Sequence, residues 1–551
     1  MPSTERYRFE PSAHVDTFAR AHLPPQDQWP KMLWDSLPEL RAYPRRMNCA
    51  RELLDRQAAK FGNRPVIHYN DEIWTYQKLL QTANRIAHVL VDDLGVKPGN
   101  RVLLRAPNNP MYVACWFAVM KAGAIAVATM PLYRWRELTY MADRAEIEVA
   151  LCDWRLREEM ETTLRESRHL KRCVYFCGEG DGTLEARMAA KPAEFDTVDT
   201  AWDDVCLIAF TSGTTGPAKG CMHFHRDVLV ICDTFGRHVL RPGQDDIFTG
   251  SPPIAFTFGL GALVTFPMHV GASTVLVEQY NPQKMLETIQ AKKVTVLFTA
   301  PTAYRTMTDL VPDYDISSLR KCVSAGESLP RPTWQGWYEA TGIGIIDGIG
   351  STEMLHIFIS AAGKDIRPGA TGKPIPGFQA RVVDDSGEPV PPGTIGRLAV
   401  RGPTGCRYLD NPERQAAYVQ DGWNVTGDAY RCDEDGYFWY QARTDDMIVS
   451  AGYNISGPEV ETVLMLHPLV QECAVVGVPD AQRGQLVKAF VVLRDKSRAD
   501  AETAKSLQDF VRAEIAPYKY PRAIEFIDAL PRTQTGKVQR YLLRQTGFAE
   551  K

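Results

Sequence analysis

The segment best suited to chemistry is a run of glycines, hydroxyl side chains and one lysine at 211–220, TSGTTGPAKG, directly after the apolar stretch VCLIAF. Glycines let backbone amides approach an anion, hydroxyls donate hydrogen bonds to it, and Lys219 adds positive charge. The spacing differs from the G-x-x-x-x-G-K-[ST] loop, and no G-x-G-x-x-G occurs in the chain. The run therefore predicts a polyphosphate loop of another kind.

Three later motifs could supply the rest of a nucleotide site. GSTE (350–353) sets a hydroxyl beside a carboxylate, and the two together can hold a phosphate and its magnesium ion. GWNVTGD (422–428) ends in Asp428, which can accept hydrogen bonds from both hydroxyls of a ribose. LPRTQTGKVQR (530–540) carries Lys537, whose charge can stabilise a carboxylate that attacks a phosphate. Taken singly, each motif is also typical of a helix cap, a turn or a solvated surface, so no one of them establishes a site.

Short apolar strands that alternate with helices are expected to position these motifs. RVLLRAP (101–107) precedes a helix-like run from Met111, VTVLFTA (294–300) precedes a helix that opens at Pro301, and KCVSAGE (321–327) ends in a loop of small residues. This alternation is typical of parallel sheets covered by helices on both faces. The fold class predicted for the larger part of the chain is therefore α/β.

The pattern changes after about residue 378. Alternating apolar positions with Gly and Pro turns at 378–402 predict a small β-rich subdomain. Arg-Thr-Asp-Asp at 443–446 separates two apolar strands and suggests a domain boundary, so we predict one domain over 1–444 and a second over 445–551. Two helix-like stretches and two strands in the second domain indicate an α+β unit.

Composition excludes several other classes of protein. The chain has 551 residues with a formal net charge of −4, which argues against a general nucleic-acid binder. Twelve cysteines occur without any Cys-x-x-Cys, as expected for scattered reduced thiols in a cytoplasmic protein. The polar N-terminus lacks the apolar core of a secretion signal. The apolar run 113–130 is interrupted by Lys121 and Gly123 and predicts a buried helix and strand rather than a membrane span.

Together the motifs resemble, in order and over about residues 50–545, those of the adenylate-forming superfamily, which includes acyl-CoA synthetases, peptide-synthetase adenylation domains and firefly luciferase. The resemblance implies that Thr352 contacts the α-phosphate of ATP, that Glu353 binds Mg²⁺, and that Lys537 serves adenylation as a catalytic residue. It also implies that Asp428 and Arg443 bind the ribose. The residues that it implies for binding ATP or coenzyme A are Thr211, Ser212, Gly213, Thr214, Thr215, Lys219, Ala325, Gly326, Glu327, Asp347, Gly348, Ile349, Asp428, Arg443 and Gly452.

The same resemblance implies a two-step reaction with a moving C-terminal domain. A carboxylate attacks the α-phosphorus of ATP, pyrophosphate leaves, the domain turns about a hinge at Asp445, and a thiol then displaces AMP. Gly452, in SAGYNISGPEVE (450–461), would let the backbone lie close to the pantetheine arm. One departure is Ile349, where the family usually has Tyr, so the adenine would pack on an aliphatic side chain. Acetylation of Lys537 would remove its charge, which makes it a hypothetical point of regulation.

The acid is expected to be aromatic. SPPIAFTFGLGALVTFP (251–267) has no Phe-Asp-x-Ser motif to bind an ammonium group, which disfavours α-amino acids. FTFGLG together with GSTEMLHIF (350–358) is similar to benzoate-CoA and 2-aminobenzoate-CoA ligases. That similarity implies that His356 lies beside the ring and favours an amino or hydroxyl substituent near the carboxylate. The residues that it implies around the ring are Thr257, Phe258, Ala325, Gly350, His356 and Ile357.

Several alternatives remain open from the sequence. The acceptor could be the phosphopantetheine of a carrier protein instead of free coenzyme A, the chain could be a non-catalytic nucleotide-binding relative, or it could be a luciferase-like oxidase. The combination of Glu353, Asp428 and Lys537 argues against the non-catalytic alternative. His223 and His225 suggest a metal pair, but no third ligand accompanies them, so zinc is disfavoured. We expect a monomer or homodimer that binds small molecules only.

Overall fold

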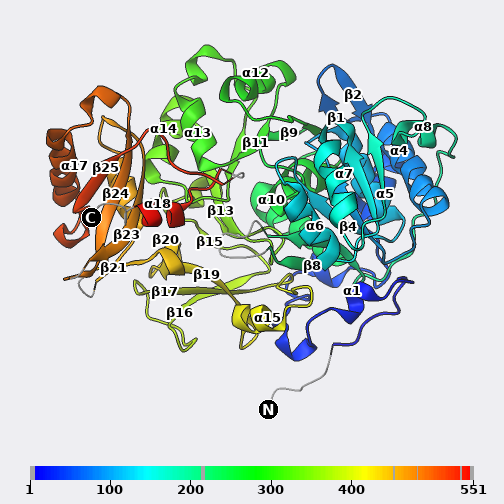
Figure 1. Cartoon of the computed structure of the whole chain (residues 1–551), viewed down its shortest axis with the longest axis horizontal. Helices are drawn as coiled ribbons and strands as arrows, with labels where there is room; N and C mark the ends of the chain where they lie inside the picture. Colours follow the sequence, from blue (N-terminus) through cyan, green and yellow to red (C-terminus); the bar gives the residue numbers. More distant parts are fainter. Residues whose placement is uncertain (1–6, 212–217, 451–452, 481, 534–535, 547–551) are drawn as a thin grey trace.

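The computed structural model describes residues 7–211, 218–450, 453–480, 482–533 and 536–546. Within these ranges the strands form four sheets, two in the large α/β part, one in the β-rich part and one in the C-terminal part. Figure 1 shows helices covering the two sheets of the large part, with α5 and α6 over one and α12, α13 and α14 over the other. The predicted combination of a large α/β unit, a β-rich subdomain and a smaller α+β unit is thereby confirmed.

The first sheet of the large part is parallel except for its last strand. β3, β4, β5, β6 and β7 run parallel, and β8 returns antiparallel to β7. In sheet order the strands are β6 (Arg172–Phe176), β5 (Val149–Asp153), β3 (Arg101–Arg105), β4 (Ile125–Thr129), β7 (Val205–Phe210) and β8 (Gly220–Phe224).

Every residue of α5 (Pro110–Lys121) is buried, and the helix packs against α4 (Tyr76–His88) and against strands β3 and β4 of this sheet. The helix begins where the Asn109 side chain accepts a hydrogen bond from the Tyr112 amide at 2.9 Å, with Pro110 in the first turn. The apolar run 113–130 is therefore a buried helix followed by a buried strand, as its interruptions predict. No helix in the described ranges is long and apolar enough to cross a membrane.

The second sheet of the large part is parallel at its centre and antiparallel at its edges. Its helices include α10 (Thr257–Leu260), α12 (Pro282–Lys292), α13 (Pro301–Thr308) and α14 (Arg331–Thr341). In sheet order the strands are β15 (Lys373–Pro374), β14 (Ile357–Ser360), β13 (Ile345–Gly350), β12 (Lys321–Ser324), β11 (Val296–Thr299), β9 (Ile247–Gly250), β10 (Ser273–Val275), β1 (Pro65–Tyr69) and β2 (Glu72–Thr75).

The β-rich subdomain predicted after residue 378 is an antiparallel sheet. Its strands are β16 (Gln379–Val383), β17 (Ile395–Arg401), β18 (Val419–Gln420), β19 (Trp423–Cys432) and β20 (Phe438–Arg443), with α15 (Pro412–Tyr418) beside them. The N-terminal segment runs along this subdomain, where the Lys31 and Leu33 amides donate to the carbonyls of Gly422 and Gly402 at 2.8 and 2.9 Å.

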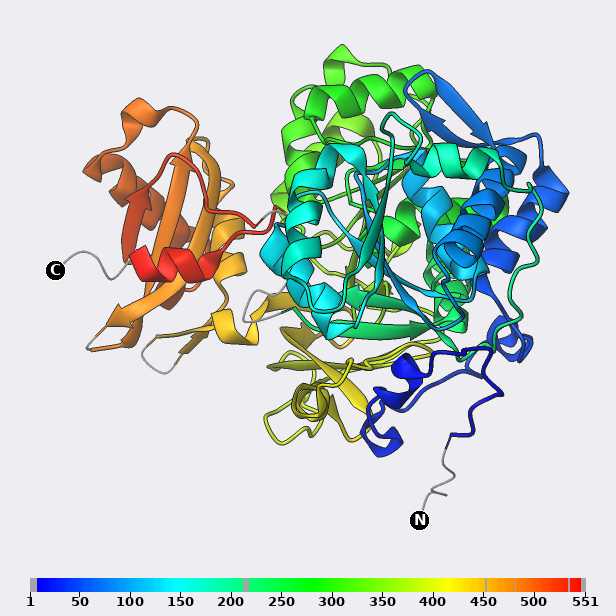
Figure 2. The same ribbon diagram turned by 45° about the vertical axis from the view of Figure 1, so that its right-hand side comes forward.

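The C-terminal part has more elements than the two helices and two strands expected from the sequence. Its sheet contains β21 (Ile448–Ser450), β22 (Tyr453–Ile455), β23 (Val470–Asp480), β24 (Gly484–Leu493) and β25 (Ala523–Phe526), with the helices α16 (Gly457–Leu464), α17 (Ala501–Glu514) and α18 (Arg540–Thr546). The extra strands are three or four residues long, too short to show alternation. Figure 2 shows this part beside the large one, with the segment after β25 reaching across to it.

Candidate functional site

The base of the predicted phosphate loop closes between β7 and β8. The Thr211 amide donates to the Lys219 carbonyl at 2.9 Å, and the Lys219 amide donates to Thr211 Oγ1 at 3.1 Å. Lys219 Nζ lies 5.4 Å from the centre of the Tyr408 ring, a cation–π contact. The predicted phosphate ligands Ser212, Gly213, Thr214 and Thr215 lie outside the described residues.

The predicted metal and phosphate ligands follow β13. Glu353 is 8% exposed, and its Oε1 accepts a hydrogen bond from the Tyr408 hydroxyl. Burial, and next the Glu353 charge, raise the pKa of Tyr408, so the hydroxyl keeps its proton and donates. The Thr352 carbonyl accepts from His223 Nε2 at 2.8 Å. One carboxylate oxygen is thus held by the protein, and a carboxylate of this kind is a suitable ligand for Mg²⁺ beside a phosphate.

The predicted adenine site contains a buried acceptor. Asp347 Oδ1 has no hydrogen-bond partner within the described residues, while Ser360 Oγ donates to the Asp347 backbone carbonyl at 2.6 Å. Burial raises the pKa of Asp347 to about 7, against the lowering effects of the Gly348 amide and the Ser324 hydroxyl. An adenine amino group is a donor that would satisfy this oxygen. The orphaned acceptor therefore fits a nucleotide base.

We expect the affinity for ATP to depend on pH through Asp347. The carboxylate accepts more strongly when ionised, so the affinity should rise as the pH increases through about 7 and fall toward tenfold per pH unit below it. Asp347→Asn keeps an acceptor and removes the titration. The measurement is the dissociation constant for ATP, by calorimetry, of the wild type and of Asp347→Asn between about pH 5.5 and 8.5. The titration of ATP itself affects both proteins alike, so it cancels in the ratio of the two constants. Identical pH profiles would contradict the assignment.

The loop after β12 lies against the C-terminal part. Ala325 is 5% exposed, Gly326 has φ +90°, and Glu327 Oε2 accepts from Thr302 Oγ1 at 2.8 Å. Arg532 Nη1 lies 3.8 Å from Glu327 Oε1. The predicted Ala325–Glu327 segment therefore borders the loop that carries Lys537.

The predicted ribose ligands face each other on neighbouring strands. Asp428 on β19 is in register with Arg443 on β20, and Arg443 Nη1 donates to Asp428 Oδ1 at 2.9 Å. The Asp428 carboxylate is the largest influence on Arg443 and raises its pKa. The pair leaves the second carboxylate oxygen of Asp428 for a ribose hydroxyl.

Lys537 joins these groups from the C-terminal part. Its backbone is anchored to Thr533, whose amide donates to the Lys537 carbonyl at 2.7 Å. Burial and the Arg443 charge lower the pKa of Lys537, while the carboxylates of Asp428, Glu327 and Glu353 oppose that shift. Lys537 therefore lies within electrostatic range of the predicted ribose ligand Asp428 and the predicted metal ligand Glu353.

The predicted hinge residue Asp445 lies in the short helix η9 (Thr444–Asp446). Its carbonyl accepts from Arg544 Nη1 at 3.3 Å, and the same guanidinium lies 2.6 Å from Asp446 Oδ1. Gly452, expected near the pantetheine arm, lies outside the described residues.

His356 is enclosed by aromatic rings. Its ring centre lies 5.4 Å from that of Phe235, 5.8 Å from that of Phe258 and 4.7 Å from that of Phe266. Burial lowers the pKa of His356 to about 3, which the Phe258 backbone opposes in part, so the imidazole is neutral at working pH. Neither ring nitrogen has a well-formed hydrogen bond within the described residues.

The other predicted pocket residues surround the same region. A Cβ added to Gly261 would lie 2.4 Å from His356 Cδ2, so this glycine makes room for the ring. A Cβ on Gly350 would lie 2.7 Å from the His356 backbone, while Ile357 packs on Gly348. Thr257 and Phe258 begin α10 and are half-buried, and Phe258 packs both on His356 and on the hydrophobic core at Phe298.

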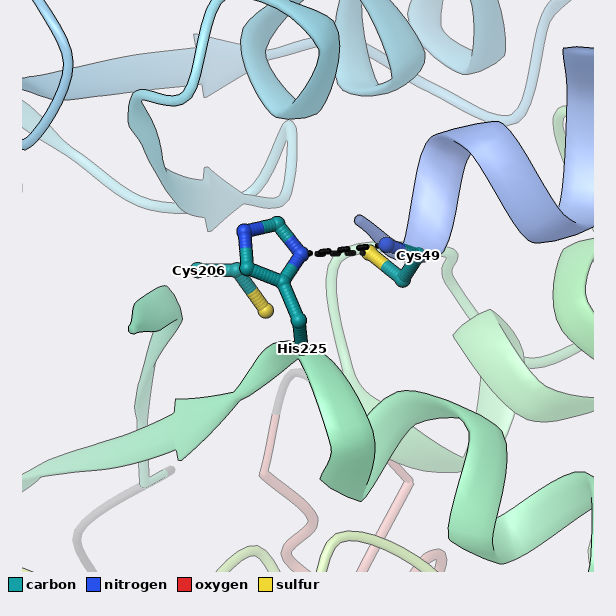
Figure 3. Close-up of side chains that lie close together, drawn as sticks. All are labelled: Cys49, Cys206 and His225. Atoms are coloured by element: carbon teal, nitrogen blue, oxygen red, sulfur yellow. Dashed lines mark hydrogen bonds between the residues drawn. The ribbon is translucent and has the colours of Figure 1, made fainter. Parts of the chain in front are cut away.

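His223 and His225 do not converge on one point. His223 contacts Thr352, whereas His225 lies near Cys49 and Cys206, with one ligand atom from each of the three within 4.8 Å of the others (Figure 3). His225 Nδ1 is 3.1 Å from the Cys49 amide nitrogen and 3.2 Å from Cys49 Sγ. Because the amide donates to Nδ1, the lone pair of that nitrogen is already used, and a hydrogen-bonded core explains the cluster.

Several residues of this region have no motif or spacing in the sequence that would predict a place in the site. Tyr408 and Arg407 carry no spacing signal, and Asp227 and Gly261 resemble ordinary helix residues. Asp227 pairs with Arg407 in the interior, and the sequence signal for it is an acidic residue just after a histidine-bearing strand, in HFHRD (223–227).

Comparisons with known proteins agree with this geometry. The family model of the AMP-binding enzyme matches residues 54–407, and that of the AMP-binding enzyme C-terminal domain matches 459–537. A benzoate-CoA ligase of Thauera aromatica is 34% identical over 507 residues, covering 91% of this chain and 96% of the relative. The mitochondrial acyl-coenzyme A synthetase ACSM3 of Mus musculus is 32% identical over 526 residues, covering 91% of each chain.

Among solved structures, the anthranilate CoA ligase AuaEII in complex with anthranoyl-AMP aligns with a TM-score of 0.88 at 35% identity, covering 92% of this chain and 98% of that one. The chain belongs to the AMP-binding enzymes, as an adenylate-forming acid–CoA ligase similar to the benzoate and anthranilate ligases. ATP and coenzyme A are accordingly its substrates. The resemblance read from its motifs is confirmed.

Proposed function

We propose that this chain converts an aromatic acid, 2-aminobenzoate or benzoate, to its coenzyme A thioester with ATP and Mg²⁺. The observation that carries the proposal is His356, a neutral imidazole that lies among three phenylalanine rings and whose nitrogens have no hydrogen-bond partner in the part of the chain that the structure describes. A flat ring suits the aromatic walls, and a substituent amine or hydroxyl suits the imidazole. Similarity to a benzoate ligase and to an anthranilate ligase supports the same class of acid.

In the first step, the acid carboxylate attacks the α-phosphorus of ATP and pyrophosphate leaves. Thr352 and Lys537 bind the charge that develops on the α-phosphate, and Asp428 with Arg443 fixes the ribose. Glu353 would hold Mg²⁺, which offsets the charge of the phosphates when bound. Asp347 to Ile349 line the adenine.

In the second step, the C-terminal domain turns about Asp445 and removes Lys537 from the site. The coenzyme A thiolate attacks the acyl-adenylate carbonyl, the bond to phosphate breaks, and AMP leaves. Gly452 would bring the backbone against the pantetheine arm. This step needs no covalent enzyme nucleophile.

The test is pyrophosphate and AMP release with Mg²⁺, ATP and coenzyme A across benzoate, 2-aminobenzoate, hydroxybenzoates, a medium-chain fatty acid and acetate, with thioesters measured by mass. A preferred aromatic acid supports the proposal. A preference for the fatty acid would overturn the aromatic assignment, and pyrophosphate release without a thioester would indicate a carrier-protein acceptor.

Replacing His356 with Ala should lower the ratio of kcat/KM for 2-aminobenzoate over benzoate by about tenfold, the worth of one lost hydrogen bond. Phe235→Leu is the matched control, because Phe235 contacts the same imidazole and the substitution exchanges one apolar side chain for another. It should change both acids alike. An unchanged ratio in His356→Ala would remove the assigned role.

A further inference from the structure

Three consecutive residues after β13 are each held, directly or through a relay, by the segment 404–408. Thr404 Oγ1 donates to the Met354 carbonyl at 2.8 Å. The Tyr408 hydroxyl donates to Glu353 Oε1. Arg407, next to Tyr408, reaches the third residue, Thr352, through two other side chains.

The relay from Arg407 to Thr352 is fully buried. The Arg407 guanidinium pairs with Asp227 Oδ2, and His223 Nδ1 lies 3.8 Å from the same oxygen, a close approach beyond hydrogen-bond distance. His223 Nε2 then lies 2.8 Å from the Thr352 carbonyl. A carbonyl only accepts, so Nε2 carries the proton and donates.

The side chains that make these contacts are almost completely shielded from solvent. Thr404, Arg407, His223 and Asp227 are 0% exposed, and Tyr408 is 1% exposed. In such surroundings a hydrogen bond is strong and an unmade one is costly, so each contact holds its partner in one position. These contacts therefore restrict the conformation of residues 352–354, in addition to packing the interior around them.

Tyr408 has a second contact that links it to the predicted phosphate loop. Lys219 Nζ lies over its ring at 5.4 Å. The same side chain thus touches the carboxylate expected to bind Mg²⁺ and the lysine expected to bind phosphate. Holding Oε1 of Glu353 also restricts rotation of that carboxylate, and this hydrogen bond does not use its second oxygen.

We propose that Tyr408 and His223 are positioning residues that set Glu353 and Thr352 in the geometry needed for adenylation. The proposal rests on the proposed roles of Glu353 and Thr352 in binding the metal and the α-phosphate. Groups that orient a metal ligand typically affect metal affinity or activity by about 10- to 100-fold when they are removed.

The test is Tyr408→Phe, which keeps the ring and removes the hydroxyl. The Mg²⁺ concentration for half-maximal pyrophosphate release should rise about 10- to 100-fold, while thioester formation from a supplied acyl-adenylate stays near wild type. Tyr76→Phe is the matched control, since it removes another buried hydroxyl, bonded to the Ala272 carbonyl at 2.7 Å and remote from the site. A Mg²⁺ dependence of Tyr408→Phe equal to that of Tyr76→Phe would overturn the proposal.

Glu353→Gln separates this proposal from the function on which it rests. If Glu353→Gln shifts the Mg²⁺ dependence and Tyr408→Phe does not, the positioning role of Tyr408 fails. If neither shifts it, the metal role of Glu353 fails, and the positioning proposal with it.

A second pair of variants tests His223. His223→Gln retains an N–H donor and should keep adenylation within about threefold of wild type, whereas His223→Leu should lose about tenfold or more in kcat with little change in KM for the acid. Equal losses in both variants would indicate that the imidazole serves packing only.

Discussion

Replacing Lys537 with Ala should slow acyl-adenylate formation by about 10²- to 10³-fold, the loss typical of removing one group that stabilises transition-state charge. Burial and the Arg443 charge disfavour the charged form of Lys537, and the carboxylates of Asp428, Glu327 and Glu353 favour it. In the proposed mechanism this cation stabilises the negative charge that develops on the α-phosphate. Pyrophosphate release in single-turnover experiments measures the effect.

The second half-reaction provides the internal control. Thioester formation from a supplied acyl-adenylate should remain within a few-fold of wild type in Lys537→Ala, because the proposed mechanism uses the lysine in the first step only. Lys496→Ala, which removes an exposed lysine paired with Asp528, should leave both half-reactions unchanged. Equal losses in both half-reactions of Lys537→Ala would show that the substitution damages the domain and not the adenylation step.

Elements whose signals are local could be predicted from the sequence. The buried strand β7 ends at the glycine-rich run, and the strand-and-helix pairs β3–α5 and β11–α13 were expected at nearly their observed positions. Strand β12 likewise ends at the predicted small-residue loop. Caps, prolines and apolar runs are properties of neighbouring residues, so a single sequence carries them.

Contacts between segments far apart in the chain have no local sequence signal and could not be predicted. Tyr408 and Glu353 are 55 residues apart, and Arg407 and Asp227 are 180 apart, so no periodicity connects them. The predicted roles of Glu353 and Thr352 came from their motif, whereas the side chains that hold them depend on tertiary packing. The raised pKa of Asp347 is a similar case, because it results from burial that only the folded chain creates.

Replacing Asp227 with Ala should lower the free energy of unfolding of the large domain by about 3–5 kcal/mol, because it leaves buried cations without their partner. Arg407 is 0% exposed and pairs directly with Asp227, and Arg226 Nε lies 3.9 Å from Asp227 Oδ1 at 1% exposure. Asp227 Oδ2 also accepts from the Phe224 amide at 3.0 Å, so the start of α9 (His225–Ile231) loses its cap as well.

Asp227→Asn removes the charge of this side chain and keeps its shape, so it shows how much of the stability loss comes from the charge alone. It keeps an oxygen for the Phe224 amide but leaves the Arg407 charge unbalanced, so most of the loss should persist. Asp199→Ala is the matched control, because that carboxylate pairs with Arg46 and Arg51 at the surface with its side chain 55% exposed. An exposed pair of this kind contributes about 1 kcal/mol or less. Urea unfolding followed by tryptophan fluorescence, read as the midpoint of the large-domain transition, compares the three variants.

The pH dependence of these variants follows from the same contacts. Burial, the largest single influence, opposes ionisation of Asp227, but Arg407, His223 and Arg226 together outweigh it and lower the pKa of the carboxyl below its ordinary value. A carboxyl whose pKa is lower in the folded state contributes stability above its unfolded pKa and loses it as the pH falls through the folded value. The difference between wild type and Asp227→Asn should therefore be full at neutral pH and shrink below about pH 4. A difference that stays constant across that range would show that Asp227 acts through packing and not through its charge.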